Sequence, residues 1–365
     1  MKLKKLFIAG ALFAGIASAS AQNIKSEIES KAYSDPIAPV GNKMLTVPPV
    51  VKPILNQWMR DTYVTYGPDG NYYLMGTTTS PTSIPKMNDG LYLWRSHDMK
   101  SWEALGRIWS LEKDAAAWQK NGIPIKPGGH AVIWAPELHY IKNKKQWLII
   151  ACLNGKNGSF ILRSTSGKPQ GPYENIIGNA NKPIFPEIDG SLFEDDDGKV
   201  YVIGHNHYIA RMNDELTDLA EPFQKFIETP YHPEPYIEGV YMVKYNRKYQ
   251  LLQTVWSVKK PDGSYSYLRA AGEDDNLHSY DVVVAEADNI YGPYGSRYPA
   301  ILQGGHNDLF TDKNGDWWST TFFNPRGECG KIFPVTCRPA VVAVKWVEGK
   351  LMPDRERNNK FYGND

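Results

Sequence analysis

Residues 188–202 read Ile-Asp-Gly-Ser-Leu-Phe-Glu-Asp-Asp-Asp-Gly-Lys-Val-Tyr-Val, and they contain the clearest turn signal of the chain. A short apolar run ends in an acidic turn, and a second β-rich run begins directly after Asp197-Gly198-Lys199. An Asp-Gly pair between two β-rich runs is a strong signal for a β-hairpin. We therefore predict two antiparallel strands joined by a tight turn near Asp197.

The same module, turn residues followed by an aromatic or aliphatic strand, occurs five times along the chain. It is found at residues 68–74, 142–148, 196–202, 245–251 and 312–318. Repetition at intervals of roughly 50 to 75 residues suits an architecture in which each repeat forms one four-stranded blade. We therefore predict an all-β fold, a five-bladed β-propeller whose four-stranded antiparallel blades surround a central channel.

A polar or acidic residue stands about ten to twelve residues before the second strand of each predicted hairpin, in an otherwise apolar setting. These residues are Asp61, Glu137, Asp189, Glu238 and His306. The first strand of a propeller blade lines the channel, so equivalent positions in five blades would ring one axial pocket. Because buried carboxylates are costly without partners, their recurrence at this position indicates a functional site.

The composition excludes several classes of partner. The 365-residue chain has a formal net charge of +1 and no basic block, so nucleic acid and anionic membranes are poor candidates. Long amphipathic helical patterns are scarce, and residues 111–121 are the best helix candidate. The three cysteines show no zinc spacing, and Cys329 and Cys337 flank a short loop where they either pair or remain thiols.

The N-terminus has the features of an export signal. A basic head at residues 1–5 precedes an apolar run at residues 6–16 and then Ala19-Ser20-Ala21. This pattern indicates a secretory signal peptide, and the run is too short to span a bilayer as a mature helix. We expect a signal peptide at residues 1–21, an extended lead-in at 22–55 and a single propeller domain at 56–365. The mature protein is expected in the periplasm or outside the cell, without membrane insertion and as a monomer.

Four motifs follow one another in blade order along this chain. They are Trp134-Ala135-Pro136-Glu137-Leu138, Ile188-Asp189-Gly190-Ser191-Leu192-Phe193, Glu238-Gly239-Val240-Tyr241 and Gly304-Gly305-His306-Asn307-Asp308. In this order and spacing they resemble glycoside hydrolase family 43, the five-bladed propeller enzymes that act on arabinose- and xylose-containing glycans. The similarity extends from about Trp58 to Trp346.

The resemblance implies three catalytic carboxylates. The general base of the family opens the first blade and corresponds to Asp61. Its pKa modulator corresponds to Asp189 and its general acid to Glu238. Inverting hydrolysis needs a protonated acid at the leaving oxygen and an ionised base at the attacking water. Thr62, Gly190 and Val240 stand where the family usually has proline, which suggests a distant subgroup and weakens any transfer of substrate.

Further residues are expected to bind the sugar. Trp134 is the first choice for an aromatic platform, with Trp58 and Trp256 as further candidates. Glu137 is expected to bond to substrate or to a neighbouring strand, and Arg338 to reach hydroxyl groups or form a surface salt bridge. His306, whose counterpart in the family often lies near a central ion, is the candidate ligand for a structural calcium or sodium ion. No organic cofactor is implied.

We therefore expect an inverting glycosidase that removes terminal pentose units, α-L-arabinofuranose or β-D-xylose, from plant-type polysaccharides or oligosaccharides. Terminal action depends on the loops at residues 79–89 and 111–129 closing one end of the channel. Three alternatives remain open. They are a non-catalytic carbohydrate-binding propeller, a retaining hydrolase of the fructan-cleaving type, and an enzyme that cleaves galactofuranose on the same fold.

Overall fold

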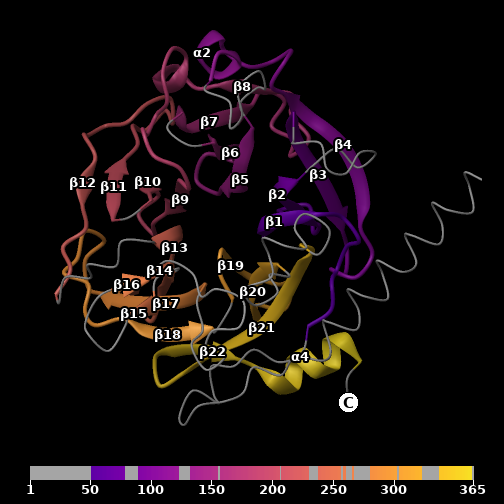
Figure 1. Cartoon of the computed structure of the whole chain (residues 1–365), viewed down its shortest axis with the longest axis vertical. Helices are drawn as coiled ribbons and strands as arrows, with labels where there is room; N and C mark the ends of the chain where they lie inside the picture. Colours follow the sequence, from indigo (N-terminus) through magenta and orange to yellow (C-terminus); the bar gives the residue numbers. More distant parts are fainter. Residues whose placement is uncertain are drawn as a thin grey trace, which may run out of the picture.

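The computed structural model shows a five-bladed β-propeller, as the five hairpin modules predict (Figure 1). It describes residues 51–78, 89–122, 132–154, 157–205, 207–229, 237–255, 258–259, 265–266, 280–301, 304–322 and 337–363, with the backbone alone at 258–259 and 265–266. The predicted signal peptide, most of the lead-in, residues 79–88 and 123–129 of the two closing loops, Trp256 and the Cys329–Cys337 pairing lie outside these residues.

Each blade is a sheet of four antiparallel strands that are consecutive within the blade, apart from a small ribbon inserted in blade four. Blade one holds β1 (Met59–Tyr66), β2 (Tyr72–Thr78), β3 (Gly90–Ser96) and β4 (Glu103–Ser110). Blade two holds β5 (Ile133–Ile141), β6 (Gln146–Leu153), β7 (Gly158–Ser164) and β8 (Tyr173–Asn175). Blade three holds β9 (Ser191–Glu194), β10 (Val200–Gly204), β11 (Tyr208–Arg211) and β12 (Gln224–Lys225).

Blade four holds β13 (Ile237–Tyr245), β14 (Lys248–Val255), β17 (Asp281–Ala287) and β18 (Tyr298–Ile301), and its inserted ribbon is β15 (Val258–Lys259) with β16 (Tyr265–Ser266). Blade five holds β19 (Leu309–Thr311), β20 (Trp317–Phe322), β21 (Pro339–Val347) and β22 (Lys350–Pro353). Figure 1 shows β1, β5, β9, β13 and β19 nearest the centre of the ring. All five predicted hairpins join the first two strands of a blade.

The core is divided among the interfaces between neighbouring blades. The second strand of blade two, β6, shows how this works, because alternate side chains of a strand point to opposite faces. Trp147, Ile149 and Ala151 pack into a cluster shared with blade one. Leu148 and Ile150 pack into a cluster shared with blade three. Strands buried on both faces therefore appear as near-continuous apolar runs in the sequence.

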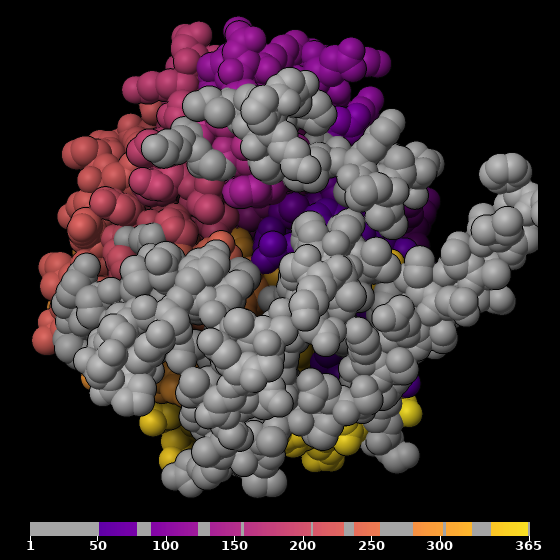
Figure 2. Space-filling model, viewed as in Figure 1, coloured from indigo at the N-terminus to yellow at the C-terminus, as the bar shows by residue number. Residues whose placement is uncertain are grey.

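The ring closes where blade five meets blade one. Phe310, Trp318 and Val341 of blade five share a cluster with residues of blade one, including Tyr72 and Leu74. Backbone hydrogen bonds also cross this seam, from the Ile54 amide to the Pro339 carbonyl and from the Met59 amide to the Cys337 carbonyl. In the space-filling view, indigo atoms of blade one lie near orange atoms of the last third of the chain at the centre of the face (Figure 2).

The helices depart from the prediction. Of residues 111–121, only α2 (Ala117–Lys120) is α-helical, and a turn occupies the residues before it. Ser110 and Asp114 explain this difference, because their hydrogen bonds hold the chain in a turn between β4 and α2. An unpredicted helix, α4 (Arg355–Tyr362), packs on β21 near the C-terminus, and a one-turn 3₁₀ helix spans Ile177–Asn179. Within the described ranges, no helix reaches the length and apolarity that crossing a membrane requires.

Candidate active site

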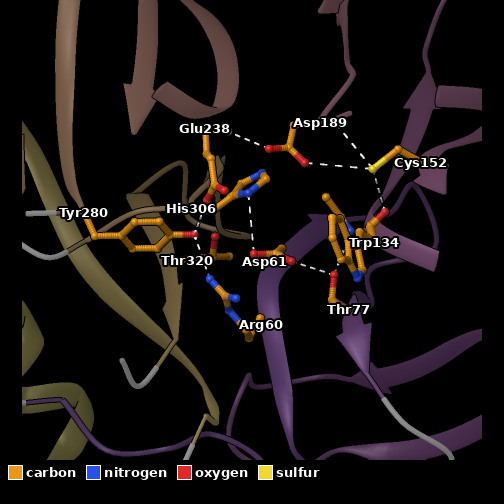
Figure 3. A network of polar contacts seen from close by, with 12 residues as sticks. Arg60, Asp61, Thr77, Trp134, Cys152, Asp189, Glu238, Tyr280, His306 and Thr320 are labelled. Carbon is orange, nitrogen blue, oxygen red and sulfur yellow. Dashed lines mark hydrogen bonds and ion pairs between the residues drawn. The ribbon is translucent and has the colours of Figure 1, made fainter. Parts of the chain in front are cut away.

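Three predicted acids converge on the channel axis from three different blades (Figure 3). Asp61 is on β1, Asp189 lies just before β9, and Glu238 is on β13. His306, just before β19, stands among them: its Nδ1 lies 3.5 Å from Oδ1 of Asp61. The backbone amide of Gly239, next to Glu238, donates to Oδ2 of Asp189 at 3.3 Å. Contacts between neighbouring blades therefore join these positions in two pairs, Asp61 with His306 and Asp189 with the backbone beside Glu238.

A local bend presents these side chains to the channel. One left-handed residue lies at or just before the innermost strand of each of blades one to four: Asp61 (φ 48°), Ala135 (φ 42°), Asp189 (φ 55°) and Gly239 (φ 52°). In blades one, two and four, the strand register shifts at this point. A bulge of this kind bends the strand and redirects a side chain.

The bend corrects the prediction that five polar residues occupy equivalent positions. Asp61 and Asp189 are themselves left-handed, whereas Glu238 directly precedes its left-handed glycine. Glu137 follows Ala135 by two residues, and the matching position in blade one, just beyond the register shift, is Tyr63. Counting residues back from each hairpin missed this difference, because the extra residue of a bulge shifts the position along the channel.

The carboxyl of Asp61 is held by a hydroxyl that the sequence did not reveal. Thr77 Oγ1 donates to Asp61 Oδ2 at 2.6 Å and accepts the amide of Ala135 at 2.7 Å. Thr77 pairs across the hairpin with Arg60, the residue before the acid. The strand register of the first hairpin, which places Thr77 opposite Arg60, would have indicated that Thr77 lies near Asp61.

Asp189 is buried, with 6% of its surface exposed, and its partners are sulfur and nitrogen atoms. Its amide donates to Sγ of Cys152 at 3.5 Å, and this thiol lies 3.9 Å from Asp189 Oδ1. Nδ1 of His205 lies 3.7 Å from Oδ2. Burial raises the pKa of the Cys152 thiol well above its ordinary value, so the sulfur remains a neutral neighbour of the carboxylate.

His306 is the electrostatic centre of the site. Burial opposes its positive charge, but the carboxylates of Asp189, Asp61 and Glu238 outweigh burial and raise the pKa of the imidazole above 6.5. An imidazolium at this position favours the ionised form of Asp61, whose Oδ1 is 3.5 Å from its Nδ1.

The predicted ion at His306 would need several donor atoms around it. Within the described ranges, no group of three or more His, Cys, Asp or Glu residues is arranged to hold a metal ion. A calcium or sodium ion beside His306 would therefore depend on water or carbonyl ligands, which such hard cations accept. The ion stays a prediction.

Glu137 belongs to a separate buried group further along β5. Its Oε2 accepts from the Ser191 hydroxyl of β9 at 2.7 Å and lies 2.7 Å from Nε2 of His139. Burial raises the pKa of the Glu137 carboxyl from 4.5 to about 8 and lowers the pKa of His139 from 6.5 to about 3. The expected bond from Glu137 to a neighbouring strand is confirmed, and a contact with substrate stays a prediction.

Two other predicted sugar contacts, Trp134 and Arg338, are among the described residues. Trp134 is partly exposed on β5, directly before Ala135, and Figure 3 places its indole beside Asp61. Arg338 is 3% exposed, and its guanidinium donates to the Asn56 side chain and the Cys337 carbonyl. This corrects the alternative of a surface salt bridge, because the guanidinium is buried. Substrate contacts of Trp134 and Arg338 stay predictions.

Comparison with known proteins agrees with this geometry. The family model described as glycosyl hydrolases family 43 matches residues 50–349. A β-D-galactofuranosidase of Aspergillus niger is 29% identical over 223 residues, which cover 53% of this chain and 59% of that protein. A putative β-xylosidase of Escherichia coli is 26% identical over 270 residues, covering 65% of this chain and 44% of that protein. The chain thus spans about half the length of these curated relatives.

Solved structures share the fold. One described as an endo-1,4-β-xylanase from Bacteroides thetaiotaomicron aligns with a TM-score of 0.59 at 22% identity, covering 83% of this chain and 96% of that one. At this identity, the likeness concerns the propeller architecture alone. The family match extends from before β1 to the end of β21, and it includes the positions of the three acids and His306. The chain therefore belongs to family 43 of the glycosyl hydrolases, a family of inverting glycosidases.

Proposed function

We propose that this chain is an inverting glycosidase that releases terminal pentose units, α-L-arabinofuranose or β-D-xylose, from plant-type polysaccharides or oligosaccharides. The observation that carries this proposal is the convergence of Asp61, Asp189 and Glu238 around His306. The family match and the β-xylosidase name of the E. coli relative support the choice of reaction and sugar.

In the proposed reaction, Glu238 is the general acid and Asp61 the general base. A water molecule attacks the anomeric carbon and gives one proton to Asp61, while Glu238 gives its proton to the leaving oxygen as the glycosidic bond breaks. The two carboxyls of inverting enzymes are roughly 6.5–9.5 Å apart to leave room for this water. Residues on blades one and four, separated by His306, suit an arrangement with the sugar between them.

Asp189 is proposed as the residue that keeps Glu238 protonated. A nearby carboxylate favours the protonated form of an acid, and Asp189 is bonded to the amide directly after Glu238. His306 would stabilise the ionised states of Asp61 and Asp189 by its positive charge. Different surroundings for chemically similar carboxyls are the usual way to separate an acid from a base.

A second candidate substrate is a terminal β-D-galactofuranose. The A. niger relative bears the name β-D-galactofuranosidase, and its match covers just over half of this chain. A five-membered galactose ring resembles arabinofuranose in shape and differs by its exocyclic carbon. The size of the sugar pocket therefore decides between these substrates.

The test is hydrolysis of aryl α-L-arabinofuranosides, β-D-xylosides and β-D-galactofuranosides by the wild type, Asp61→Asn and Glu238→Gln. We expect the wild type to cleave one of these sugars and Asp61→Asn to lose activity by at least about 100-fold, the scale of acid–base catalysis. Glu238→Gln should show a loss of this size on the unsubstituted phenyl glycoside, whose leaving oxygen needs a proton. Glu103→Gln, a substitution of an exposed acid on β4, is the control expected to match the wild type. Undiminished turnover in both site variants would contradict the assignment of Asp61 and Glu238.

Two further measurements address the alternatives. The anomeric configuration of the first product, read by NMR, separates inversion from the retaining alternative. Binding of oligosaccharides without any turnover would instead support a non-catalytic propeller.

We also propose that residues 1–21 are removed on export to the periplasm or cell exterior and that the mature chain is a monomer. The basic head, apolar run and Ala-Ser-Ala site support removal of this segment. Intact mass and light scattering of protein expressed with its full N-terminus would test both statements. A mature protein that retains Met1, or a stable dimer, would contradict them.

A further inference from the structure

A tyrosine and an arginine extend the polar network behind Glu238 (Figure 3). The hydroxyl of Tyr280 donates to Oε2 of Glu238 at 3.3 Å, and Nη2 of Arg60 donates to the same hydroxyl at 3.4 Å. The Arg60 guanidinium also lies over the ring of Phe322, 5.0 Å from its centroid. Three side chains from blades one, four and five thus fix the surroundings of one carboxyl oxygen.

The chemistry of these groups sets the direction of the hydrogen bonds. A guanidinium has donors and no acceptor, so the Tyr280 hydroxyl accepts from Arg60 and points its own proton toward Glu238. Tyr280 is 2% exposed, and burial raises its pKa well above 10. The phenol therefore keeps its proton, and Glu238 Oε2 faces a permanent donor.

A protonated carboxyl has one oxygen that carries the proton and one carbonyl-type oxygen that accepts. Because Oε2 accepts from Tyr280, the proton belongs on Oε1. We propose that Tyr280, oriented by Arg60, is a positioning residue that fixes the catalytic proton on Oε1 of Glu238. This inference rests on the proposed role of Glu238 as the general acid.

The expected consequence depends on the leaving group. Proton donation matters most when the departing oxygen is basic and least when it leaves readily as an anion. Without the Tyr280 hydroxyl, the carboxyl can rotate and place its proton on either oxygen. The rate should then fall for basic leaving groups and remain close to normal for activated ones.

The experiment uses the full-length enzyme and a series of aryl glycosides of the sugar that the wild type cleaves, from 2,4-dinitrophenyl to unsubstituted phenyl. The variants are Tyr280→Phe, Arg60→Lys and Glu238→Gln. Tyr294→Phe is the matched control, since Tyr294 is also fully buried in blade four and its hydroxyl donates to the Ile290 carbonyl. Thermal melts report whether each variant is folded.

We expect Tyr280→Phe to lower kcat by about tenfold or more on the phenyl glycoside and by less than about twofold on the dinitrophenyl glycoside. Arg60→Lys should show a weaker effect with the same dependence, and Tyr294→Phe should follow the wild type. Because Arg60→Lys preserves the phenol, it tests the inference even if Tyr280→Phe does not fold.

An equal loss on every leaving group, or no loss at all, in Tyr280→Phe and Arg60→Lys would overturn the positioning role while Glu238→Gln still shows the leaving-group dependence. If Glu238→Gln itself shows no such dependence, the proposed general acid is wrong and this inference falls with it. The two failures are therefore distinguishable in one data set.

Discussion

At the scale of single residues, the site depends on atoms that orient carboxyls as much as on the carboxyls themselves. The Thr77 hydroxyl has one proton, and because it accepts the Ala135 amide, that proton is directed to Asp61. A base that abstracts a proton from water must keep a lone pair aimed at the water. The hydrogen bond from Thr77 restrains Oδ2 of Asp61. The other oxygen, Oδ1, is not bonded to Thr77 and faces His306.

Substitution of Thr77 by valine should therefore weaken catalysis while preserving shape. We expect kcat to fall by about tenfold, since a hydrogen bond to a charged group is worth about 1.5–3 kcal/mol. The control is Thr78→Val, at the next residue along β2. This substitution removes a buried hydroxyl that donates to the Trp58 carbonyl. Steady-state kinetics would give kcat for both variants. An equal loss of kcat in Thr77→Val and Thr78→Val would argue against a specific role for Thr77.

Gly239 combines a left-handed backbone with a crowded position. A β-carbon built there would stand 2.6 Å from Cδ2 of His306, closer than such atoms approach in real proteins. Gly239→Ala should therefore displace the imidazole or Glu238 and lower kcat by about 100-fold, the range of acid–base catalysis. Kinetics and a thermal melt would measure the two consequences.

Gly315→Ala is the matched control, because Gly315 has φ 82° but its β-carbon would meet nothing within 4 Å. It should cost about 1 kcal/mol of stability from backbone strain alone and leave kcat unchanged. Similar activity in the two variants would mean that the contact with His306 is unimportant.

At the scale of elements, strands β5 and β9 are joined by a titratable link. Glu137 on β5 accepts from Ser191 on β9, and burial raises its pKa to about 8. The unfolded chain loses this proton near pH 4.5, while the folded protein keeps it until about pH 8. This contribution to stability is therefore complete below pH 4.5 and is lost as the pH rises toward 8.

The contribution of His139 to stability depends on pH in the opposite direction. Its pKa is lowered to about 3, so its contribution is complete above pH 6.5 and is lost as the pH falls. Between pH 6.5 and 8, the wild-type Tm should therefore fall with rising pH, and Glu137→Gln should flatten this slope. His306, whose pKa is raised, contributes in the same direction as Glu137 and should leave a residual slope.

Scanning calorimetry at several pH values would measure these slopes. Glu103→Gln, in which the exposed partner of Arg95 is changed, should show the wild-type slope. A Glu137→Gln slope identical to the wild type would contradict the protonated state of Glu137.

Elements with local turn signals were predictable from the sequence, and those defined by tertiary contacts were not. Asp-Gly and Asn-Gly turns specify a hairpin over a few residues, and they mark three of the five inner hairpins. The hairpins at residues 142–148 and 245–251 lack this pair and were found because they repeat the same module of polar turn residues before an aromatic strand. Helix α4 was missed because its buried side chain is Asn358 rather than an apolar stripe, although Asp354 at its N-cap and Gly363 at its C-cap were signals. Tyr280 reaches Glu238 from a different strand connection, so no local pattern could reveal it.

At the scale of the whole molecule, the seam between blades five and one is the place where the ring has no chain connection. Blades that follow each other in sequence are linked by the backbone, while this seam depends on side-chain packing and a few hydrogen bonds. Phe310 packs edge-on against Tyr72 across it, at a centroid distance of 6.5 Å. Opening of the ring should therefore begin here.

Phe310→Ala should destabilise the protein by about 3–5 kcal/mol, the usual cost of deleting a buried phenylalanine. Hydrogen exchange should increase in both β2 and β20, on the two sides of the seam. The control is Phe226→Ala, since Phe226 is similarly buried and packs edge-on against Tyr294 between consecutive blades. A larger drop in Tm for Phe226→Ala than for Phe310→Ala would contradict the seam as the weakest interface.

The left-handed residue shared by blades one to four also bears on how such an enzyme acquires new chemistry. The bend comes from the backbone of the blade, whereas the reactive group comes from the residue at the bend in blades one and three and from the residue before it in blade four. A blade copied by gene duplication would inherit the bend, and a single codon at or beside it would then decide whether the blade carries an acid. In blade two the left-handed residue is Ala135, so an aspartate there would bring an additional carboxylate toward the channel without a change of backbone.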